Sequence, residues 1–330
     1  MTVGIKDVAR VANVSPATVS RVLSGRAVDP AMHERVMAAV RSTGYRPNLA
    51  ARRLRSRHTN TIGLIVADIR NPFFTAVSRV VEDIAYERGL RVILCNTDED
   101  PAREAMYLQL MQEERVTGMI LAPTRAGLDK VARMETDFPV VLIDRAGEGM
   151  VHDSVVLDNP AMAARLVEHL HERGCRHVAG LFGAASSTGR ERRAGFENAA
   201  ERLAMRTQVV AVPHGPGEAE RCVAALMQAE DRPDALLASN GVMLMAVLRA
   251  LAALGLKVPD DVAVVGFDRE GWMDLVAGGL SVIEQPVEAI GRTAMTMLFD
   301  RLDDAAIPSR KVVLSGTLVA RGSSLHRQEA

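Results

Sequence analysis

The stretch that decides the start of the fold is IKDVARVANVSPATVSRVLSG, which runs from Ile5 to Gly25. Its first half spaces apolar side chains as one face of a helix does, and Asn13-Val14-Ser15 then interrupts the pattern. The apolar side chains are Ile5, Val8, Ala9 and Ala12. The pattern predicts a first short helix that ends in a three-residue turn.

A second helix is predicted directly after this turn. Ser15 is a good N-cap, because its hydroxyl can accept a free backbone N–H, and Pro16 suits the first helical position. An apolar stripe returns at Val19, Val22 and Leu23. The outer face is left to Ala17, Thr18, Ser20 and Arg21. With a third helix over residues 31–42, this is the plan of a helix-turn-helix, although an ordinary helical hairpin has the same pattern.

The distribution of charge favours the helix-turn-helix interpretation. Residues 1–60 contain eleven basic and three acidic side chains, a formal charge of +8. The remaining chain contains 29 basic and 38 acidic residues, a formal charge of −9. A nearly neutral chain therefore joins a basic head to an acidic body, as expected of a nucleic-acid-binding module fused to another domain.

The composition bounds the class of protein. A composition of 48% apolar and 25% charged residues is typical of globular proteins, and a length of 330 residues is sufficient for two or three domains. No apolar run approaches the roughly 20 residues that span a bilayer, and the N-terminus lacks a signal peptide's apolar core. We therefore expect a cytoplasmic protein without membrane contact. The scattered cysteines, Cys95, Cys175 and Cys222, predict buried thiols and no metal site.

From residue 61 short apolar runs alternate with amphipathic segments, which predicts parallel sheets with helices on both faces. The predicted strands are 62–67, 92–95, 119–122, 140–143, 178–182, 209–212, 235–238 and 262–267. The predicted helices are 75–88, 102–114, 162–173, 190–204, 218–228 and 242–254. This number of units favours two doubly wound lobes over one.

Polar residues directly follow several of the predicted strands. They are Asp68, Asn71, Asp144, Asn240 and Asp268. Ligands of open α/β sheets bind beyond the carboxyl ends of the strands, so these residues are candidates for a site between the lobes. Asp and Asn also serve as helix caps and turn formers, which is the alternative interpretation.

No common catalytic or cofactor-binding motif appears in the sequence. There is no G-x-S-x-G, Walker loop or H-E-x-x-H, and no G-x-G-x-x-G opens the first unit. We expect no enzyme activity, no cofactor and no metal, because an enzyme hypothesis would depend on fold analogy alone.

Three blocks, IKDVARVANVSPATVSRVLSG, GYRPNLAARRLRS and TIGLIVADIRNPFF, together resemble the LacI/GalR family of bacterial transcription regulators over the whole chain. The resemblance implies a small all-α helix-turn-helix head on a two-lobed α/β body of the periplasmic-binding-protein type I, with parallel doubly wound sheets. The implied domains are 1–47 (head), 48–60 (hinge helix or linker), 61–158 with 286–315 (N-terminal effector-binding lobe) and 159–285 with 316–330 (C-terminal effector-binding lobe).

The resemblance also implies how the head meets DNA. The second helix would enter the major groove of an operator, and a hinge helix from each subunit would enter the minor groove. The implied DNA-binding residues are Ser15, Pro16, Ala17, Thr18, Ser20 and Arg21 in the head and Leu54, a wedge between base pairs, in the hinge. Pro16 and Ala17 offer no hydrogen-bonding side chain, so base choice should depend on Arg21 and on DNA shape.

The residues that match effector contacts of the family are Asn71, Phe73, Phe74, Asp144, Arg192, Asn240, Asp268 and Gln285. Carboxylates, amides, a guanidinium and aromatic faces together suit a small polyhydroxylated ligand. The chain departs from the family at Asn240-Gly241, where members commonly have Asn-Asp.

The resulting hypothesis is a homodimeric repressor of a carbohydrate uptake or catabolism operon, which binds a pseudopalindromic operator under the control of a sugar-like effector. The alternatives are a sugar-modifying enzyme, a solute receptor, an architectural DNA binder, and a regulator that responds to a sugar acid or nucleobase. We expect the dimer interface on the helices that follow strands 62–67 and 178–182.

Overall fold

The structure is a computed structural model that describes residues 3–23, 27–45, 59–147, 151–213 and 215–325. Its contacts divide the chain into two units, Met1–Thr59 and Asn60–Ala330. Leu54 and most of the predicted hinge lie outside the described residues. Of the helices within the described ranges, none is both long and apolar enough to cross a membrane.

The described part of the first unit consists of helices α1 (Ile5–Ala12), α2 (Pro16–Leu23) and α3 (Pro30–Thr43). The Ser15 hydroxyl accepts the backbone N–H of Thr18 at 3.1 Å, so the predicted cap of α2 is confirmed. Val8, Val19 and Val36, one from each helix, are fully buried in a shared core. The helix-turn-helix plan is therefore confirmed.

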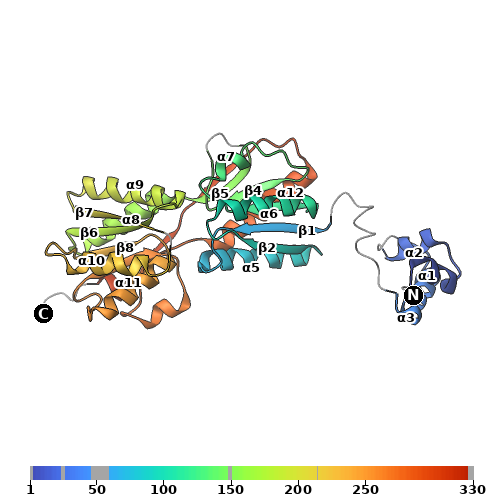
Figure 1. Cartoon of the computed structure of the whole chain (residues 1–330), viewed down its shortest axis with the longest axis horizontal. Helices are drawn as coiled ribbons and strands as arrows, with labels where there is room; N and C mark the ends of the chain where they lie inside the picture. Colours follow the sequence, from blue (N-terminus) through green and yellow to red (C-terminus); the bar gives the residue numbers. More distant parts are fainter. Residues whose placement is uncertain (1–2, 24–26, 46–58, 148–150, 214, 326–330) are drawn as a thin grey trace. The chain divides into compact units, whose positions relative to one another are not determined.

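The second unit contains two sheets, each with helices on both faces (Figure 1). In the first sheet the strands have the order β11-β5-β4-β3-β1-β2 and all pair in parallel. They are β1 (Thr61–Val66), β2 (Arg91–Asn96), β3 (Gly118–Leu121), β4 (Val140–Ile143), β5 (Asp153–Leu157) and β11 (Lys311–Leu314). Helices α5 (Pro72–Glu87) and α12 (Val287–Asp303) cover one face, and α6 (Pro101–Glu113) and α7 (Leu128–Val131) the other. We call this sheet with its helices the first lobe.

The second lobe is built around a sheet of order β12-β10-β9-β8-β6-β7. Its strands are β6 (His177–Gly183), β7 (Arg206–Val212), β8 (Ala235–Ala238), β9 (Ala263–Phe267), β10 (Ser281–Glu284) and β12 (Thr317–Val319). Helices α8 (Asn159–Glu172) and α9 (Ser187–Arg202) cover one face, and α10 (Glu218–Gln228) and α11 (Gly241–Ala253) the other. Short 3-10 turns, η1 (Gly271–Leu275) and η2 (Gly322–Ser324), complete it.

One strand departs from the parallel arrangement that the rest of the two sheets follows. β12 pairs with β10 in the antiparallel direction. Only Ser315 and Gly316 separate β11 in the first sheet from β12 in the second.

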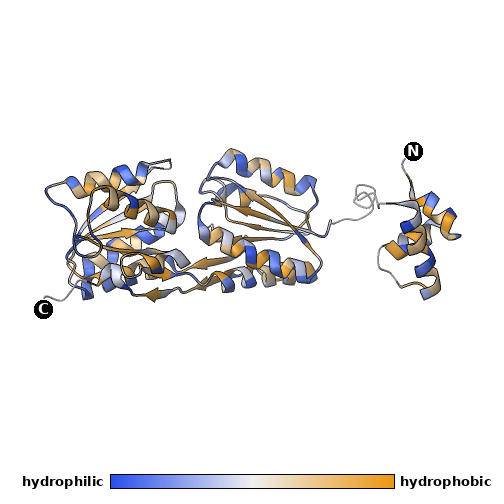
Figure 2. Ribbon diagram, turned by 90° about the horizontal axis from the view of Figure 1, so that it is seen from below, coloured by the Kyte–Doolittle hydropathy of each residue, from blue (hydrophilic) through white to orange (hydrophobic). Residues whose placement is uncertain are grey.

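The two lobes repeat a single plan. Strands β1 to β5 with β11 occupy the same positions in the first sheet as β6 to β10 with β12 do in the second. Figure 2 shows the strands as predominantly apolar and the outer helix faces as mixed, in keeping with sheets that are covered on both sides. β4 and β9 are therefore equivalent strands, and the residues that follow them are equivalent positions.

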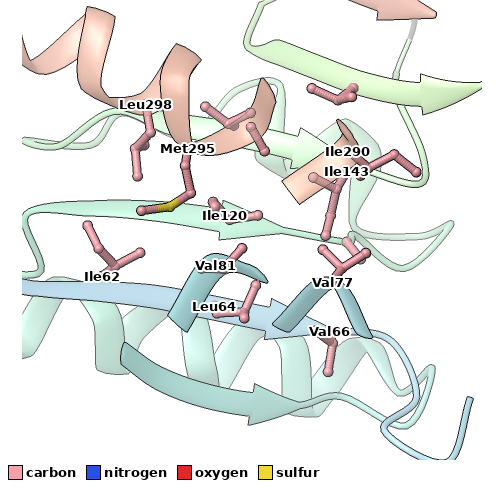
Figure 3. Packing of buried hydrophobic residues seen from close by; sticks show 14 of the residues in the cluster. Ile62, Leu64, Val66, Val77, Val81, Ile120, Ile143, Ile290, Met295 and Leu298 are labelled. Carbon is pink, nitrogen blue, oxygen red and sulfur yellow. The ribbon is translucent and has the colours of Figure 1, made fainter. Parts of the chain in front are cut away.

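The core of the first lobe depends on a helix that the sequence pattern did not predict. Ile290, Met295 and Leu298 of α12 pack against residues of the central strands such as Ile62 and Ile120 (Figure 3). The predicted strands and helices are confirmed within a few residues, whereas β5, β10, β11, β12, α7 and α12 had not been predicted.

Helices α8 and α9 approach each other very closely at Gly195. A Cβ atom at this position would lie 2.1 Å from the carbonyl oxygen of Pro160, a backbone atom that cannot swing aside. The first turn of α8 can therefore reach α9 only because residue 195 is glycine. The same approach brings Asn159 of α8 to Arg192 of α9, one turn before Gly195.

Replacing Gly195 with alanine should push these helices apart and lower the free energy of unfolding by about 1–3 kcal/mol, because the added methyl overpacks the contact. Urea unfolding followed by circular dichroism measures the change. Gly271→Ala is the matched control, since a Cβ there meets nothing within 4 Å. Equal losses in the two variants would contradict the packing argument.

Candidate functional site

Two aspartates occupy equivalent positions at the carboxyl ends of β4 and β9. Asp144 and Asp268 both have left-handed backbones, with φ of 65° and 72°. Each donates its N–H to the neighbouring strand, Asp144 to the Val155 carbonyl at 3.2 Å and Asp268 to the Ile283 carbonyl at 3.0 Å. Residues other than glycine rarely adopt this backbone conformation, and residues that do so cluster at functional sites. The repeated fold thus places one aspartate at the same point in each lobe.

Arg192 of α9 is a buried cation of the second lobe, with only 3% of it exposed. Its Nε donates to Asn159 Oδ1 at 2.8 Å, and its Nη1 donates to the Ser239 carbonyl. The guanidinium carbon lies 3.9 Å from the centre of the Phe267 ring, a cation–π contact. Nη2 has no hydrogen-bond acceptor among the described residues. Arg192 is therefore fixed in place while one of its nitrogens remains available as a donor.

Asp268 is held by two donors of its own lobe. Its Oδ2 accepts the N–H of Gly241 at 2.8 Å, and its Oδ1 accepts Nε2 of Gln285 at 2.6 Å. Asn240 caps α11 by accepting the Met243 N–H at 2.8 Å. The carboxylate of Asp268 thus accepts a backbone N–H in the first turn of α11. The structure brings together the predicted residues Asp268, Gln285 and Asn240.

The predicted residues after β1 serve the fold in this structure. Asn71 caps α5, with its Oδ1 accepting the Phe73 N–H at 3.1 Å. Phe73 and Phe74 are only 4% and 3% exposed, and they belong to the core of the first lobe. Their rings pack edge to face with centroids 5.0 Å apart. In this structure the rings of Phe73 and Phe74 therefore serve the core. The role of these residues as ligand contacts stays a prediction.

The sequence prediction missed the group that surrounds Asp144. Arg145 is 5% exposed, and its Nε donates to Asp144 Oδ2 at 3.1 Å. Its Nη1 donates to Glu99 Oε2 at 2.8 Å, and Nη2 donates to Glu99 Oε1. Glu99 lies 46 residues before Arg145, so local patterns could not reveal the pair. The available signals were the adjacency of Asp144 and Arg145 in LIDR and the acidic run CNTDED.

The buried charges act on one another's ionisation. Burial raises the pKa of the Asp144 carboxyl, while the charges of Arg145 and Arg192 oppose this rise. Burial lowers the pKa of Arg192, opposed by Asp268 and Asp144, but a guanidinium still remains protonated. Although burial acts to lower it, hydrogen bonding to Glu99 raises the pKa of Arg145. The strand ends therefore hold two cations among carboxylates.

The candidate residues of the head lie on and before α2. Ser15, Pro16, Ala17 and Arg21 are exposed, whereas Thr18 and Ser20 are half-buried. The hydroxyls of Ser15 and Thr18 lie 2.9 Å apart and share a hydrogen bond. Arg21, on the exposed side of α2, is the longest polar side chain of the predicted set.

Other features of the described residues do not point to a different site. A hollow on the first lobe is lined by Leu128, Leu142, His152, Ser154 and Lys311, among others, and by none of the predicted effector residues. Within the described ranges, no cluster of histidine, cysteine, aspartate and glutamate is suited to hold a metal ion.

A helix-turn-helix unit, combined with two equivalent lobes whose strands end in opposite charges, defines a DNA-binding regulator with a ligand-binding body. Comparison with known proteins agrees. Residues 4–48 match the bacterial regulatory proteins of the lacI family, and residues 167–324 match the periplasmic binding protein-like domain.

Relatives match over nearly the whole chain. The HTH-type transcriptional regulator PtxS of Pseudomonas plecoglossicida is 35% identical over 98% of this chain and 96% of its own length. The ribose operon repressor of Halalkalibacterium halodurans is 33% identical over 96% of both chains. The solved complex of the transcriptional regulator CelR with cellobiose is 27% identical, with a TM-score of 0.71 over 97% of this chain and 99% of that one.

The chain belongs to the LacI family of bacterial transcription regulators. The expected head, the two-lobed body and the DNA-binding regulatory function are thereby confirmed. The roles of individual residues stay predictions.

Asn159 should contribute measurably to the stability of the second lobe. It is fully buried, and its Nδ2 donates to Glu191 Oε2 at 2.7 Å while its Oδ1 accepts Arg192 Nε. Asn159→Ala should cost about 1–3 kcal/mol, because it leaves a buried guanidinium N–H without an acceptor. Urea unfolding is the measurement, with Asn198→Ala on the exposed side of α9 as control. Equal urea midpoints of the two variants would refute this role of Asn159.

Proposed function

We propose that the chain is a homodimeric, cytoplasmic repressor of a carbohydrate uptake or catabolism operon. It binds a pseudopalindromic operator, and a small sugar-like effector held between the two lobes controls the affinity. The proposed domains are residues 1–47 for DNA binding, 48–60 for the hinge, 61–158 with 286–315 for one effector-binding lobe, and 159–285 with 316–330 for the other. The proposed dimer interface includes α5 and α9.

The observation that carries this proposal is the placement of Asp144 and Asp268 at equivalent strand ends, together with the buried Arg192 of α9. Asp144 Oδ1 accepts no hydrogen bond from the described residues, and Arg192 Nη2 donates none. A ligand of this site must therefore offer both a donor and an acceptor, as a hydroxyl group does. The names of two relatives, a ribose operon repressor and a regulator in complex with cellobiose, support a sugar.

An enzyme is the less favoured alternative. Both aspartates are engaged by partners, Asp144 with Arg145 and Asp268 with Gln285 and Gly241. In these contacts the carboxylates act as hydrogen-bond acceptors. The contacts do not activate a nucleophile beside either aspartate. We propose that a bound sugar leaves the site unchanged. A sugar acid or a nucleobase remains the alternative effector.

Arg21 should carry direct recognition of the operator. Arg21→Ala should cost about 1–3 kcal/mol against the preferred inverted repeat, because arginine can contact a guanine with two hydrogen bonds. Fluorescence anisotropy with a repeat selected from a random pool, against unselected DNA, measures the loss. Arg35→Ala, on the exposed face of α3, is the control, since loss of a phosphate contact would weaken all sequences alike. An unchanged specificity ratio in Arg21→Ala would refute this docking.

Asp268 should bind the effector through its charge. The assay is calorimetric titration with ribose, glucose, cellobiose, gluconate and adenine, and the proposal expects one of the sugars to bind. Asp268→Asn should weaken that binding by about 10- to 150-fold, the size of a hydrogen bond to a charged group. Asp260→Asn, an exposed residue of the same lobe, should bind as the parent does. Equal affinities of the two variants for the sugar would show that Asp268 does not contribute to effector binding.

A further inference from the structure

Arg145 joins three loops at the carboxyl edge of the first sheet. Besides Asp144 and Glu99, its Nη1 reaches the carbonyl oxygen of Pro123 at 3.1 Å. Glu99 follows β2, Pro123 follows β3 and Asp144 follows β4. A single guanidinium, whose donors form a planar fork, thus ties together the ends of strands spread across the sheet.

Glu99 is itself held in a fixed position. Asp98 and Glu99 have successive left-handed backbones, with φ of 54° and 59°, and the Glu99 N–H donates to the Ala67 carbonyl at 3.1 Å. This backbone aims the carboxylate at Arg145, where it accepts from both terminal nitrogens. Two adjacent residues in a strained conformation indicate that the surroundings impose it.

The equivalent position in the second lobe lacks this arrangement. Arg269 directly follows Asp268, as Arg145 follows Asp144, but Arg269 is exposed. Arg269 Nη1 lies 3.3 Å from Glu284 Oε1, and Arg269 Nη2 lies 3.9 Å from Asp274 Oδ2. The preceding Asp268 is held by Gln285 and Gly241 instead. The buried arginine is therefore specific to Asp144 rather than a requirement of the repeated fold.

We propose that Arg145 and Glu99 are a positioning pair for the effector: Glu99 fixes Arg145, and Arg145 keeps Asp144 ionised with Oδ1 presented to a donor group of the ligand. This inference rests on the proposed function, because it assigns a role within the same site. Arg145 uses Oδ2 only, which leaves Oδ1 as the acceptor.

The charges around Asp144 give the pair a pH signature. Burial raises the pKa of Asp144, Arg145 and Arg192 oppose this rise, and Glu99 and Asp268 add to it. Removing the charge of Arg145 should therefore raise the pKa of Asp144 further. In Arg145→Gln the ionised acceptor is progressively lost as the pH falls, so affinity should decline toward low pH more steeply than in the parent.

The test measures affinity for ribose, or for the tightest binder of the titration panel if ribose does not bind, between pH 5.5 and 8.5 with the full chain. Arg145→Gln should weaken binding about 10- to 100-fold at neutral pH, with the loss growing at lower pH. Arg145→Lys should restore the pH profile in part, because it keeps the charge but not the fork. Glu99→Gln, nearly identical in shape, should give a smaller loss at neutral pH, because Arg145 loses the charge that holds both of its terminal nitrogens. Arg269→Gln is the matched control and should bind as the parent does.

A second measurement needs no ligand. Titration of the Asp144 carboxyl by carbon NMR should show a higher pKa in Arg145→Gln than in the parent, because a charge that opposes the effect of burial has been removed. An unchanged pKa in Arg145→Gln overturns the inference. A loss of affinity by the same factor at every pH also overturns it, since that marks a purely structural role. If no panel compound binds the parent, the proposed ligand class fails, and the NMR titration alone decides the role of the pair.

Discussion

The need to compensate buried charge governs the functional end of both lobes. Asp144, Arg145 and Asp268 at the strand ends and Arg192 in α9 all have little exposure, and an isolated charge there would be very costly. Each therefore has a specific partner: Arg145 has Glu99, Arg192 has Asn159 and the Phe267 ring, and Asp268 has Gln285. The strand-end loops take the conformations that these partnerships require, left-handed residues included.

The same fold is repeated in the two lobes, so buried charge has to be compensated at equivalent positions in both of them. Equivalent strands deliver an aspartate to each lobe, yet the two are stabilised differently, one by a buried arginine and the other by an amide and a helix N–H. The charge of Asp144 is also felt by Arg192 of the second lobe. A ligand that satisfies both lobes would favour one arrangement of the body over others, which is how a small molecule can bias a larger equilibrium.

Local patterns predicted a large part of the fold and only part of the site. Apolar periodicity and the Ser15 cap predicted the helix-turn-helix, and the predicted strand ends indicated Asp144 and Asp268. Both predictions were possible because they depend on residues that are close to one another in the sequence. β5 was missed because it opens with Asp153, whose buried charge is balanced by the distant Arg301 and Arg310. α12 was missed because it follows Pro286 without a side-chain cap. Glu99 lies far from Arg145 in the chain, so only the folded sheet reveals this pair.

The central claim is that the ligand site and the DNA-binding head are coupled, and thermodynamic linkage tests it most directly. The measurement is operator affinity of the full chain without and with a saturating sugar, together with the affinity for that sugar without and with operator. Coupling of the two sites requires the same factor in both directions, expected at about 5- to 150-fold. A sugar that binds through Asp268 and yet leaves operator affinity unchanged would contradict it.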